Sequence, residues 1–400
     1  MKILIVTTRL PFPPYKGDKL RIFNLAKYLA KRNQVKIVSI IKSKKEARYV
    51  DELSKYKIEV VPVYLPLWKR LFNIILGVFR REPLQVLWFY SKKMKIVIKK
   101  LINDSKPDVV FYCLIRGAQY FDENFSKGIL NVLDLIDAIS LYLYRFYNVE
   151  KKPIKRFLIF REFKRVLSYE KIAEKFDVSF LCSSFDMEYL KSNGINANFK
   201  VIYNGINESF FEIKGDVIYD PKRIAFIGNL SYFPNLDAIY FFVREILPYI
   251  LEKEPDAKFY IVGKNPPLRI RMMASKNIIV TGFVEDIKYE YLKSALIVAP
   301  IRFGAGMQNK IIEAIALGVP VVTTTLSLNG LPPELKEFVF VADQPEEFAT
   351  RVIEILNNPK IRFHLHEVKN VVKKVLSLDI IGQELENYLA NMLRNKTKEI

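Results

Sequence analysis

The segment from residue 299 to residue 323 has the backbone features best suited to holding a ligand. A strand is predicted to end at Pro300, and Gly304 and Gly306 follow it, which lets the backbone turn and approach a bound molecule closely. A helix is predicted to begin near Met307, with its free amides and the positive end of its dipole facing that turn. The segment therefore predicts an anion site where a strand ends and a helix begins.

Three charged side chains border the same turn. Arg302 precedes the glycines, Lys310 lies one turn into the helix, and Glu313 follows Lys310 by three residues on a neighbouring position of one face. This set suits a nucleoside diphosphate, with the two cations on the phosphates and the carboxylate on the ribose hydroxyls. The alternative interpretation is an ordinary strand–glycine–helix turn that carries a surface lysine–glutamate pair.

The composition excludes several other kinds of site. Cys113 and Cys182 are the only cysteines and belong to no CxxC or Cys/His cluster, so no zinc site, disulfide scaffold or other metal site is expected. The only histidines are His364 and His366, which excludes histidine chemistry earlier in the chain. The loop at 8–18 has no GxGxxG, and the chain has no GxxxxGK(S/T), which argues against a dehydrogenase or a P-loop NTPase.

Short apolar runs alternate with amphipathic stretches, which predicts βαβ units and parallel sheets. Strands are expected at residues 2–7, 35–40, 58–63, 108–113, 129–133 and 178–182, and again at 223–227, 258–262, 277–281, 295–299 and 320–324. A first helix is expected over 18–31, capped by Asp18, and a helical tail over about 346–392.

The strand–helix rhythm restarts at a joint near residues 204–216, where glycines break the pattern. The predicted fold class is therefore α/β, with two Rossmann-like domains. We expect an N-terminal domain over 1–205, a second domain over 206–375, and a C-terminal helix in 376–400 that packs back on the first domain.

The segment around Glu313 resembles the signature of glycosyltransferase family 4, the glycosyl transferases group 1. That family ends a strand in proline, has a glycine-containing turn, and continues with Glu-Ala-Met-Ala-x-Gly-x-Pro-Val-Val, which here reads Glu-Ala-Ile-Ala-Leu-Gly-Val-Pro-Val-Val. Further elements of the family are similar to the sequence at 203–207, 225–230, 259–263 and 280–284. Residues 13–21, 134–137 and 161–174 resemble a bacterial subgroup of exopolysaccharide sugar transferases.

The resemblance implies the GT-B fold, in which two Rossmann-like domains face each other across a cleft. It places a nucleotide-sugar donor at Gly228, Asn229, Gly263, Gly282, Phe283, Val284, Arg302, Gly304, Ala305, Gly306, Met307, Lys310 and Glu313. It places the acceptor near Gly17, Asp18, Arg116 and Gln119, and it makes Asp18, Asp137, Arg302 and Lys310 the catalytic candidates.

The chain departs from the family pattern at the donor sugar. Retaining members carry Glu-x7-Glu, and here Glu313 matches the second acid whereas Ala305 replaces the first. Asp18 either orients the acceptor hydroxyl or only caps the first helix. Asp137 either acts from the other rim or is a buried structural acid.

The implied activity is that of a retaining, hexosyltransferase-type glycosyltransferase in cell-surface glycan synthesis. The donor is a nucleotide sugar such as a UDP- or GDP-sugar, which is a substrate and not a cofactor, and the acceptor is lipid-linked or a polysaccharide. One alternative is a non-catalytic GT-B protein that binds a nucleotide sugar or a glycan, and Ala305 motivates it. A sugar-nucleotide epimerase of the same fold would need acid and base residues that the predicted cleft lacks.

Positive charge is concentrated in the first half of the chain. The net charge is +20, and residues 1–200 hold 39 Lys and Arg against 19 Asp and Glu, whereas residues 201–400 hold 24 of each. The segment 68–102 has nine Lys and Arg, one acid and both tryptophans, which is typical of a helix in a membrane interface. The alternative is an amphipathic helix packed on the first sheet with a solvated basic face.

We therefore expect an anionic membrane surface as a partner. Nucleic acid is disfavoured, because no nucleic-acid-binding motif accompanies the charge. The chain has no run of 18 uncharged apolar residues, and its first apolar stretch is too short for a signal peptide. These features predict a cytoplasmic protein that is peripheral at the inner face of the membrane.

Overall fold

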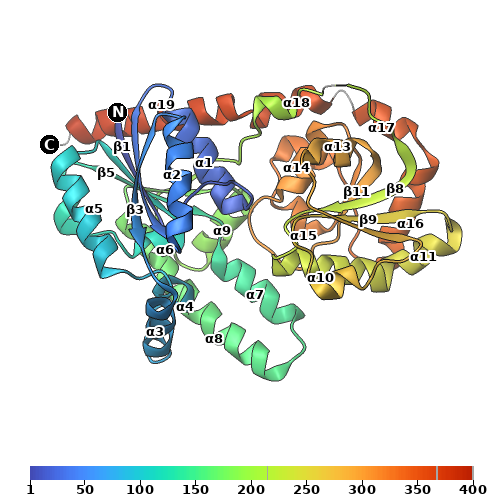
Figure 1. Cartoon of the computed structure of the whole chain (residues 1–400), viewed down its shortest axis with the longest axis horizontal. Coiled ribbons are helices and arrows are strands. Elements are labelled where there is room, and N and C mark those ends of the chain that lie inside the picture. Colours follow the sequence, from blue (N-terminus) through green and yellow to red (C-terminus); the bar gives the residue numbers. More distant parts are fainter. Residues whose placement is uncertain (214, 366–367, 399–400) are drawn as a thin grey trace. The chain divides into compact units, whose positions relative to one another are not determined.

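The computed structural model of the protein describes residues 1–213, 215–365 and 368–398. Its contacts divide the chain into two units, whose ribbons are drawn in Figure 1. The first unit is Met1–Gly205 together with Leu378–Ile400, and the second unit is Ile206–Ser377. Lys214, in the predicted joint, lies outside the described residues.

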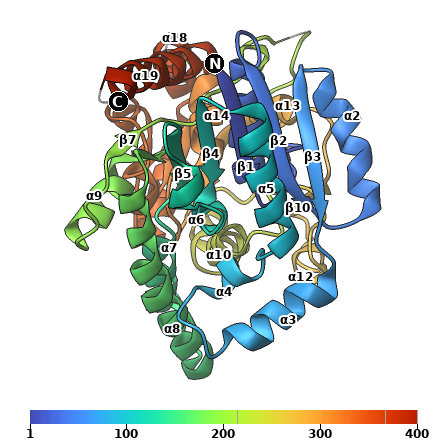
Figure 2. The same cartoon turned by 90° about the vertical axis from the view of Figure 1, so that its left-hand side faces the viewer.

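The first unit is built on a parallel sheet with the strand order β3-β2-β1-β4-β5-β6-β7. Its strands are β1 Lys2–Thr7, β2 Gln34–Ile41, β3 Ile58–Tyr64, β4 Val109–Cys113, β5 Leu130–Ile136, β6 Val178–Leu181 and β7 Phe199–Val201. Its helices are α1 Gly17–Leu29, α2 Arg48–Ser54, α3 Leu67–Gly77, α4 Leu84–Leu87, α5 Lys92–Ser105, α6 Leu114–Ala118, α7 Ile139–Val149, α8 Pro153–Glu170, α9 Ser184–Ser192 and α19 Leu378–Lys398. In Figure 2, α5 lies in front of this sheet.

The second unit repeats the architecture with the strand order β10-β9-β8-β11-β12-β13, again all parallel. Its strands are β8 Asp220–Ile227, β9 Lys258–Val262, β10 Ile278–Gly282, β11 Ser294–Ala299, β12 Val321–Thr323 and β13 Phe340–Val341. Its helices are α10 Phe233–Phe241, α11 Leu247–Lys253, α12 Leu268–Arg271, α13 Ile287–Leu292, α14 Asn309–Ala316, α15 Thr325–Leu328, α16 Pro345–Asn357, α17 Lys360–Leu365 and α18 Val368–Leu376.

The predicted fold class, two Rossmann-like parallel sheets, is confirmed. Every predicted strand is present and differs by three residues at most at either end. The short strands β7 and β13 escaped prediction because three and two residues carry no periodicity. β4 and β5 are buried at every residue, as parallel strands covered on both faces by helices must be.

The last helix, α19, packs against α1 in the first unit. A Cβ atom at Gly382 would lie 2.3 Å from the ring of Tyr28, so only glycine lets the two helices approach this closely. The Asn33 side chain donates a hydrogen bond of 2.7 Å to Glu386. The red helix α19 can be followed along the first unit in Figure 1.

The predicted cap of the first helix is wrong. Lys16 occupies the N-cap position of α1 without a side-chain capping bond, and Asp18 lies inside the first turn. The Asp18 carboxylate instead accepts hydrogen bonds from Arg9 at 2.9 Å and from Arg116 at 3.1 Å. The carboxylate is therefore bound by two guanidinium groups.

One turn later in α1, Arg21 forms a buried ion pair with Asp134 of β5. Two guanidinium nitrogens donate to Asp134, the shortest contact being 2.9 Å, and both side chains are almost fully buried. A third nitrogen donates to the Ile202 carbonyl at 2.7 Å and to the Asn204 side chain at 3.0 Å. Arg21 thus links α1 to β5 of the sheet and to residues 202–204, which follow β7.

We expect Arg21→Ala to destabilise the protein by about 3–5 kcal/mol, because it leaves the Asp134 carboxylate buried without its partner. Urea unfolding followed by circular dichroism measures the loss. Lys31→Ala is the matched control: it breaks an exposed ion pair with Asp379 and should cost at most about 1 kcal/mol. If Arg21→Ala cost no more than Lys31→Ala, Arg21 would not have this structural role.

Candidate functional site

The order of the second sheet creates a topological switch point between β8 and β11. From β8 the chain proceeds to β9 and β10 on one side, and then returns to β11 on the other side of β8. Connections that leave β8 and β11 at their carboxyl ends therefore run in opposite directions, and such a position is where open α/β sheets bind ligands. The predicted donor residues follow these strand ends.

Three of the predicted glycines meet at this edge of the sheet. The Gly263 amide donates to the Gly282 carbonyl at 3.1 Å, and the Gly228 amide donates to the Val262 carbonyl at 3.0 Å. A Cβ atom at Gly263 would lie 2.1 Å from the Gly228 carbonyl oxygen, so no side chain fits there. Gly282 has a φ of +78°, which few other residues adopt. At these three positions, the carboxyl ends of β8, β9 and β10 therefore carry no side chain.

Lys310, on α14, brings a buried amine to the same edge. Its Nζ donates to the side-chain oxygen of Asn235 at 2.6 Å and lies 4.3 Å from the centre of the Phe226 ring. The side chain also passes beside Gly228, where an added Cβ would lie 3.5 Å from the lysine Cε. Desolvation lowers the pKa of Lys310 to about 7, and the charge of Glu313 only partly opposes this. A bound anion would restore the charge of this amine.

Glu313 lies one turn further along α14 and is held by Tyr291. The Tyr291 hydroxyl donates to Glu313 Oε2 at 2.6 Å. Burial raises the pKa of Glu313, and the bond from Tyr291 and the charge of Lys310 oppose that rise. The structure thus fixes one carboxylate oxygen and brings Lys310 and Glu313 together as predicted.

Arg302 is already paired. Its Nε and Nη2 donate to the two carboxylate oxygens of Asp237, at 2.8 and 2.6 Å, and its guanidinium lies 4.7 Å from the Phe241 ring. Asp237 could not be predicted as the partner, because it lies 65 residues earlier in the chain, on α10. Of the two predicted phosphate cations, Lys310 is therefore the one bound to a neutral partner.

The turn between β11 and α14 contains Gly304, Ala305, Gly306 and Met307. Gly306 has a φ of +67°, and its carbonyl lies so close to Gly330 that an added Cβ there would be 2.3 Å away. The helix α14 begins at Asn309, two residues later than predicted. All four residues of the turn therefore precede the helix, and Gly306 has a left-handed backbone conformation that does not occur inside an α-helix.

The remaining predicted donor residues border this edge. Asn229 follows β8, and its side-chain oxygen accepts a bond of 3.0 Å from the Ser231 amide. Phe283 directly follows β10, is 59% exposed and has the Lys264 amine 5.5 Å from its ring centre. Val284, the next residue, is partly buried. An exposed aromatic ring at a strand end is a surface on which a flat base could stack.

The predicted acceptor-side residues lie in the first unit, and only some of them meet. Asp18 and Arg116 are joined by the 3.1 Å bond described above, while Gly17 opens α1 with free space around it. The Gln119 amide donates to the Val86 and Arg116 carbonyls, so it ties α6 to α4.

Asp137 occupies a separate environment at the end of β5. It accepts a bond of 3.2 Å from the Cys182 thiol. Burial, reinforced by the nearby charge of Asp186, raises the pKa of Asp137 to about 8. Its carboxyl group therefore lies in surroundings that disfavour the charged form.

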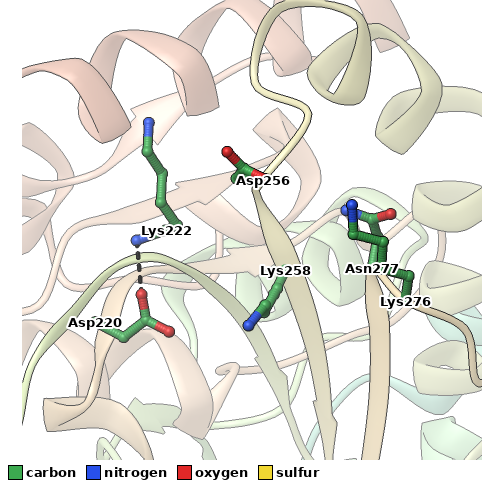
Figure 3. Close-up of a pocket in the computed structure, with 6 residues that line it drawn as sticks. All are labelled: Asp220, Lys222, Asp256, Lys258, Lys276 and Asn277. Atoms are coloured by element: carbon green, nitrogen blue, oxygen red, sulfur yellow. Dashed lines mark hydrogen bonds between the residues drawn. The ribbon is translucent and has the colours of Figure 1, made fainter.

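A surface depression elsewhere in the second unit does not coincide with this site. It lies at the opposite, amino-terminal edge of the second sheet and is lined by Asp220, Lys222, Asp256, Lys258, Lys276 and Asn277 (Figure 3). The amine of Lys222 is bound to Glu254, and the backbone amide of Lys222 is bound to Asp220. Its charges are paired or solvated, so we assign it no ligand.

The described residues contain no cluster of three or more acidic, cysteine or histidine side chains that could hold a metal ion.

We expect Lys310→Met to change how stability depends on pH. The folded-state pKa of Lys310, about 7, lies below the ordinary value of 10.5, so the unfolded chain binds this proton more tightly and wild-type stability should rise between those pH values. Lys310→Met should remove that rise and stabilise the protein near neutral pH by more than about 1.4 kcal/mol, the equivalent of one pKa unit.

Urea midpoints measured across this pH range test the prediction, with Lys276→Met, at an exposed position, as the control. Parallel pH profiles for wild type and Lys310→Met would show that the amine is not desolvated.

Comparison with known proteins agrees with this geometry. Residues 221–358 match the profile of the family Glycosyl transferases group 1. A Klebsiella pneumoniae protein, described as an uncharacterized 44.6 kDa protein in the cps region, is 24% identical over 379 residues, which are 89% of this chain and 91% of the relative.

Two solved structures show the same fold over nearly the whole chain. Sucrose-phosphate synthase from Thermosynechococcus elongatus has a TM-score of 0.72 at 13% identity and covers 99% of this chain and 100% of its own. The Anabaena protein HepE in complex with UDP has a TM-score of 0.66 at 13% identity, over 98% of this chain and 100% of its own. The resemblance predicted from the motifs is thus confirmed: residues 221–358 belong to the Glycosyl transferases group 1 family, and the two Rossmann-like units give the chain the GT-B fold.

Proposed function

We propose that the protein transfers a sugar, with retention at the anomeric carbon, from a nucleotide-diphosphate sugar to a lipid-linked or polysaccharide acceptor. The observation that carries the proposal is the desolvated Lys310 amine beside Glu313 at the switch point of a group 1 glycosyltransferase unit. HepE was solved with UDP and with UDP-glucose, which supports a nucleotide sugar such as a UDP- or GDP-sugar as the substrate. The relative from a cps region supports a role in capsule-type polysaccharide synthesis.

In the proposed reaction the bond between the anomeric carbon and the donor diphosphate breaks as the acceptor oxygen bonds to that carbon on the same face. The acceptor proton passes to the departing phosphate oxygen, so no enzyme nucleophile is needed. Lys310 and the backbone amides at 304–307 stabilise the negative charge on the leaving diphosphate, and Glu313 holds the ribose. Neither a metal nor a further cofactor has a role in this proposal.

A second candidate function is nucleotide-sugar binding without transfer, and Ala305 is the observation that favours it. The acid that the family carries at this position is missing, and alanine offers no side-chain group that could contact the donor sugar. Incubation with a panel of nucleotide sugars separates the two functions. Release of the nucleoside diphosphate in the presence of a glycan acceptor supports transfer, whereas binding without release supports the second candidate.

We expect Glu313→Ala to weaken binding of the nucleotide sugar by about 1.5–3 kcal/mol, because a charge-assisted hydrogen bond to the ribose is lost. Titration calorimetry measures this change. Glu337→Ala, an exposed position on the surface of the same unit, is the matched control and should bind as wild type does. Unchanged affinity in a folded Glu313→Ala variant would exclude the ribose role.

We propose further that the protein is peripheral at the cytoplasmic face of a membrane, with the first unit as the contact. None of the described helices is long and apolar enough to cross a bilayer. The helix α3 instead turns its apolar side chains outward: Trp68 is 64% exposed, Ile75 is 65% exposed and Phe79, just beyond the helix, is 93% exposed. Exposed apolar residues beside Lys69 and Arg80 are typical of a helix that lies in a lipid interface.

The neighbouring helix α8 adds to the same surface. Its residue Ile154 is 78% exposed, and Phe157 and Leu158 are also exposed. Arg165 of α8 donates a hydrogen bond of 2.7 Å to the Val78 carbonyl at the end of α3, so the two elements are joined. Figure 2 shows α3 and α8 at one end of the first unit.

We expect the protein to bind anionic vesicles and to lose that binding when Lys69, Arg80 and Arg81 are replaced by Gln. Each such charge contributes about 1 kcal/mol near an anionic surface, and the attraction fades as salt is added. Vesicle sedimentation measures it, with nucleotide-sugar binding as the check on folding. Replacing the exposed Lys92, Lys93 and Lys95 of α5, which lie on a helix packed on the sheet, is the control. Equal pelleting with neutral and anionic vesicles, or none with either, would contradict the prediction.

A further inference from the structure

Three arginines of the first unit surround one phenyl ring. The guanidinium carbons of Arg9, Arg70 and Arg116 lie 5.5, 5.6 and 5.1 Å from the centre of the buried Phe89 ring. The three come from different elements: the loop after β1, the helix α3 and the helix α6. The fold therefore gathers three positive charges that the sequence keeps apart.

These charges are under-compensated. Asp18 is the one carboxylate among the described residues that forms an ion pair with any of the three, bonding to Arg9 and to Arg116. The Nε of Arg70 donates only to the Leu65 carbonyl, at 3.1 Å, and its side chain is nearly fully buried. The buried atoms Arg9 Nε, Arg70 Nη2 and Arg116 Nε have no hydrogen-bond partner among the described residues. Buried cations without partners are costly, so this cluster would be stabilised by an anion.

The pKa values in the cluster agree with an uncompensated charge. Desolvation and the charge of Arg9 lower the pKa of Arg116 to about 10, and Asp18 opposes them only in part. Desolvation also lowers the pKa of Arg70, with Glu46 opposing and Arg9 adding to the effect. The pKa of Lys42 is also lowered, mainly by desolvation and next by the charge of Arg9. A nearby anion would reverse these shifts.

The cluster also occupies the position where a sheet of this kind binds ligands. In the first sheet the switch point lies between β1 and β4, because the chain leaves β1 for β2 and β3 and returns to β4 on the other side. Arg9 lies on the connection after β1 and Arg116 on the connection after β4. These two connections run in opposite directions from the carboxyl ends of their strands, the position at which open α/β sheets bind ligands.

The helix α3 links this charge cluster to the apolar surface described above. Arg70 turns inward to Phe89, whereas its neighbours Trp68, Leu71 and Phe72 are exposed. One helix thus borders an anion-binding cluster on one side and presents hydrocarbon-binding residues on the other. A ligand with an anionic head and an apolar tail matches both sides.

We propose that Arg9, Arg70 and Arg116 bind the phosphate or diphosphate group of an amphiphilic acceptor whose hydrocarbon chain lies along α3. This inference rests on the proposed function, because it names the chemical class of that acceptor. The shared chemistry is a phosphoryl group, and the experiment must separate a lipid-borne group from a free one.

Titration calorimetry on the full chain tests the site with three probes: inorganic pyrophosphate, farnesyl diphosphate and farnesol. Wild-type protein should bind both diphosphates, and should bind farnesyl diphosphate more tightly. Arg9→Gln and Arg70→Gln should each weaken both by about tenfold or more, the scale of one charge-assisted hydrogen bond. Arg32→Gln, at an exposed arginine just after α1, is the matched control and should leave the affinities unchanged. Trp68→Ala should weaken farnesyl diphosphate alone.

Arg9→Lys guards against a folding artefact, because it retains the charge on a partly exposed side chain and should keep most of the binding. Loss of diphosphate binding in Lys310→Ala but not in Arg9→Gln would place the anion in the second unit and overturn the proposal. Equal affinity for pyrophosphate and farnesyl diphosphate would overturn the proposal that the hydrocarbon chain of the acceptor lies along α3. Nucleotide-sugar binding, measured on the same samples, reports on the proposed function separately, since Arg9→Gln leaves the second unit unaltered.

Discussion

The ion pair between Arg21 and Asp134 is the constraint on which the first unit depends. Both groups are buried, so each is tolerable only while the other is present. The remaining nitrogen of Arg21 satisfies carbonyl and amide oxygens at residues 202–204, where β7 has ended and the chain is about to enter the second unit. Because Asp18 lies one turn earlier in the same helix, the ion pair also fixes the carboxylate that holds Arg9 and Arg116.

The sequence was sufficient for the sheets and for the glycines at the carboxyl edge of the second sheet. Strands and site glycines could be predicted because continuous apolar runs and glycine-containing turns are local signals. The partners that hold the charged groups could not be predicted. Asn235, Asp237 and Tyr291 contact Lys310, Arg302 and Glu313 from elements at least 22 residues away, and only the packed unit brings them together. The contacts of Arg9 with Phe89 and Asp18 could not be predicted either, because no sequence motif includes Arg9.

The basic segment of the first unit shows where composition stops being informative. Two of its helices, α3 and α5, both combine aliphatic and basic residues, yet α5 buries Met94, Ile98 and Ile102, whereas α3 exposes most of its apolar side chains. The packed amphipathic helix of one interpretation is therefore found in α5, whereas the membrane contact of the other stays a proposal for α3. Arg70, which composition grouped with the membrane-facing charges, is buried beside Phe89. The two helices differ in whether their apolar side chains are buried, and neither the periodicity nor the charge of the sequence predicts that difference.

The return of α19 to the first unit has a consequence for biosynthesis. The first unit is discontinuous in sequence, since the whole of Ile206–Ser377 is translated between its two parts. While the ribosome makes the second unit, Tyr28 and Asn33 of the first still lack the Gly382 surface and the Glu386 carboxylate that cover them. The residues of the second unit are contiguous, so all of them have been synthesised before α19 is made. The first unit begins earlier but can complete its packing only after α19 has left the ribosome.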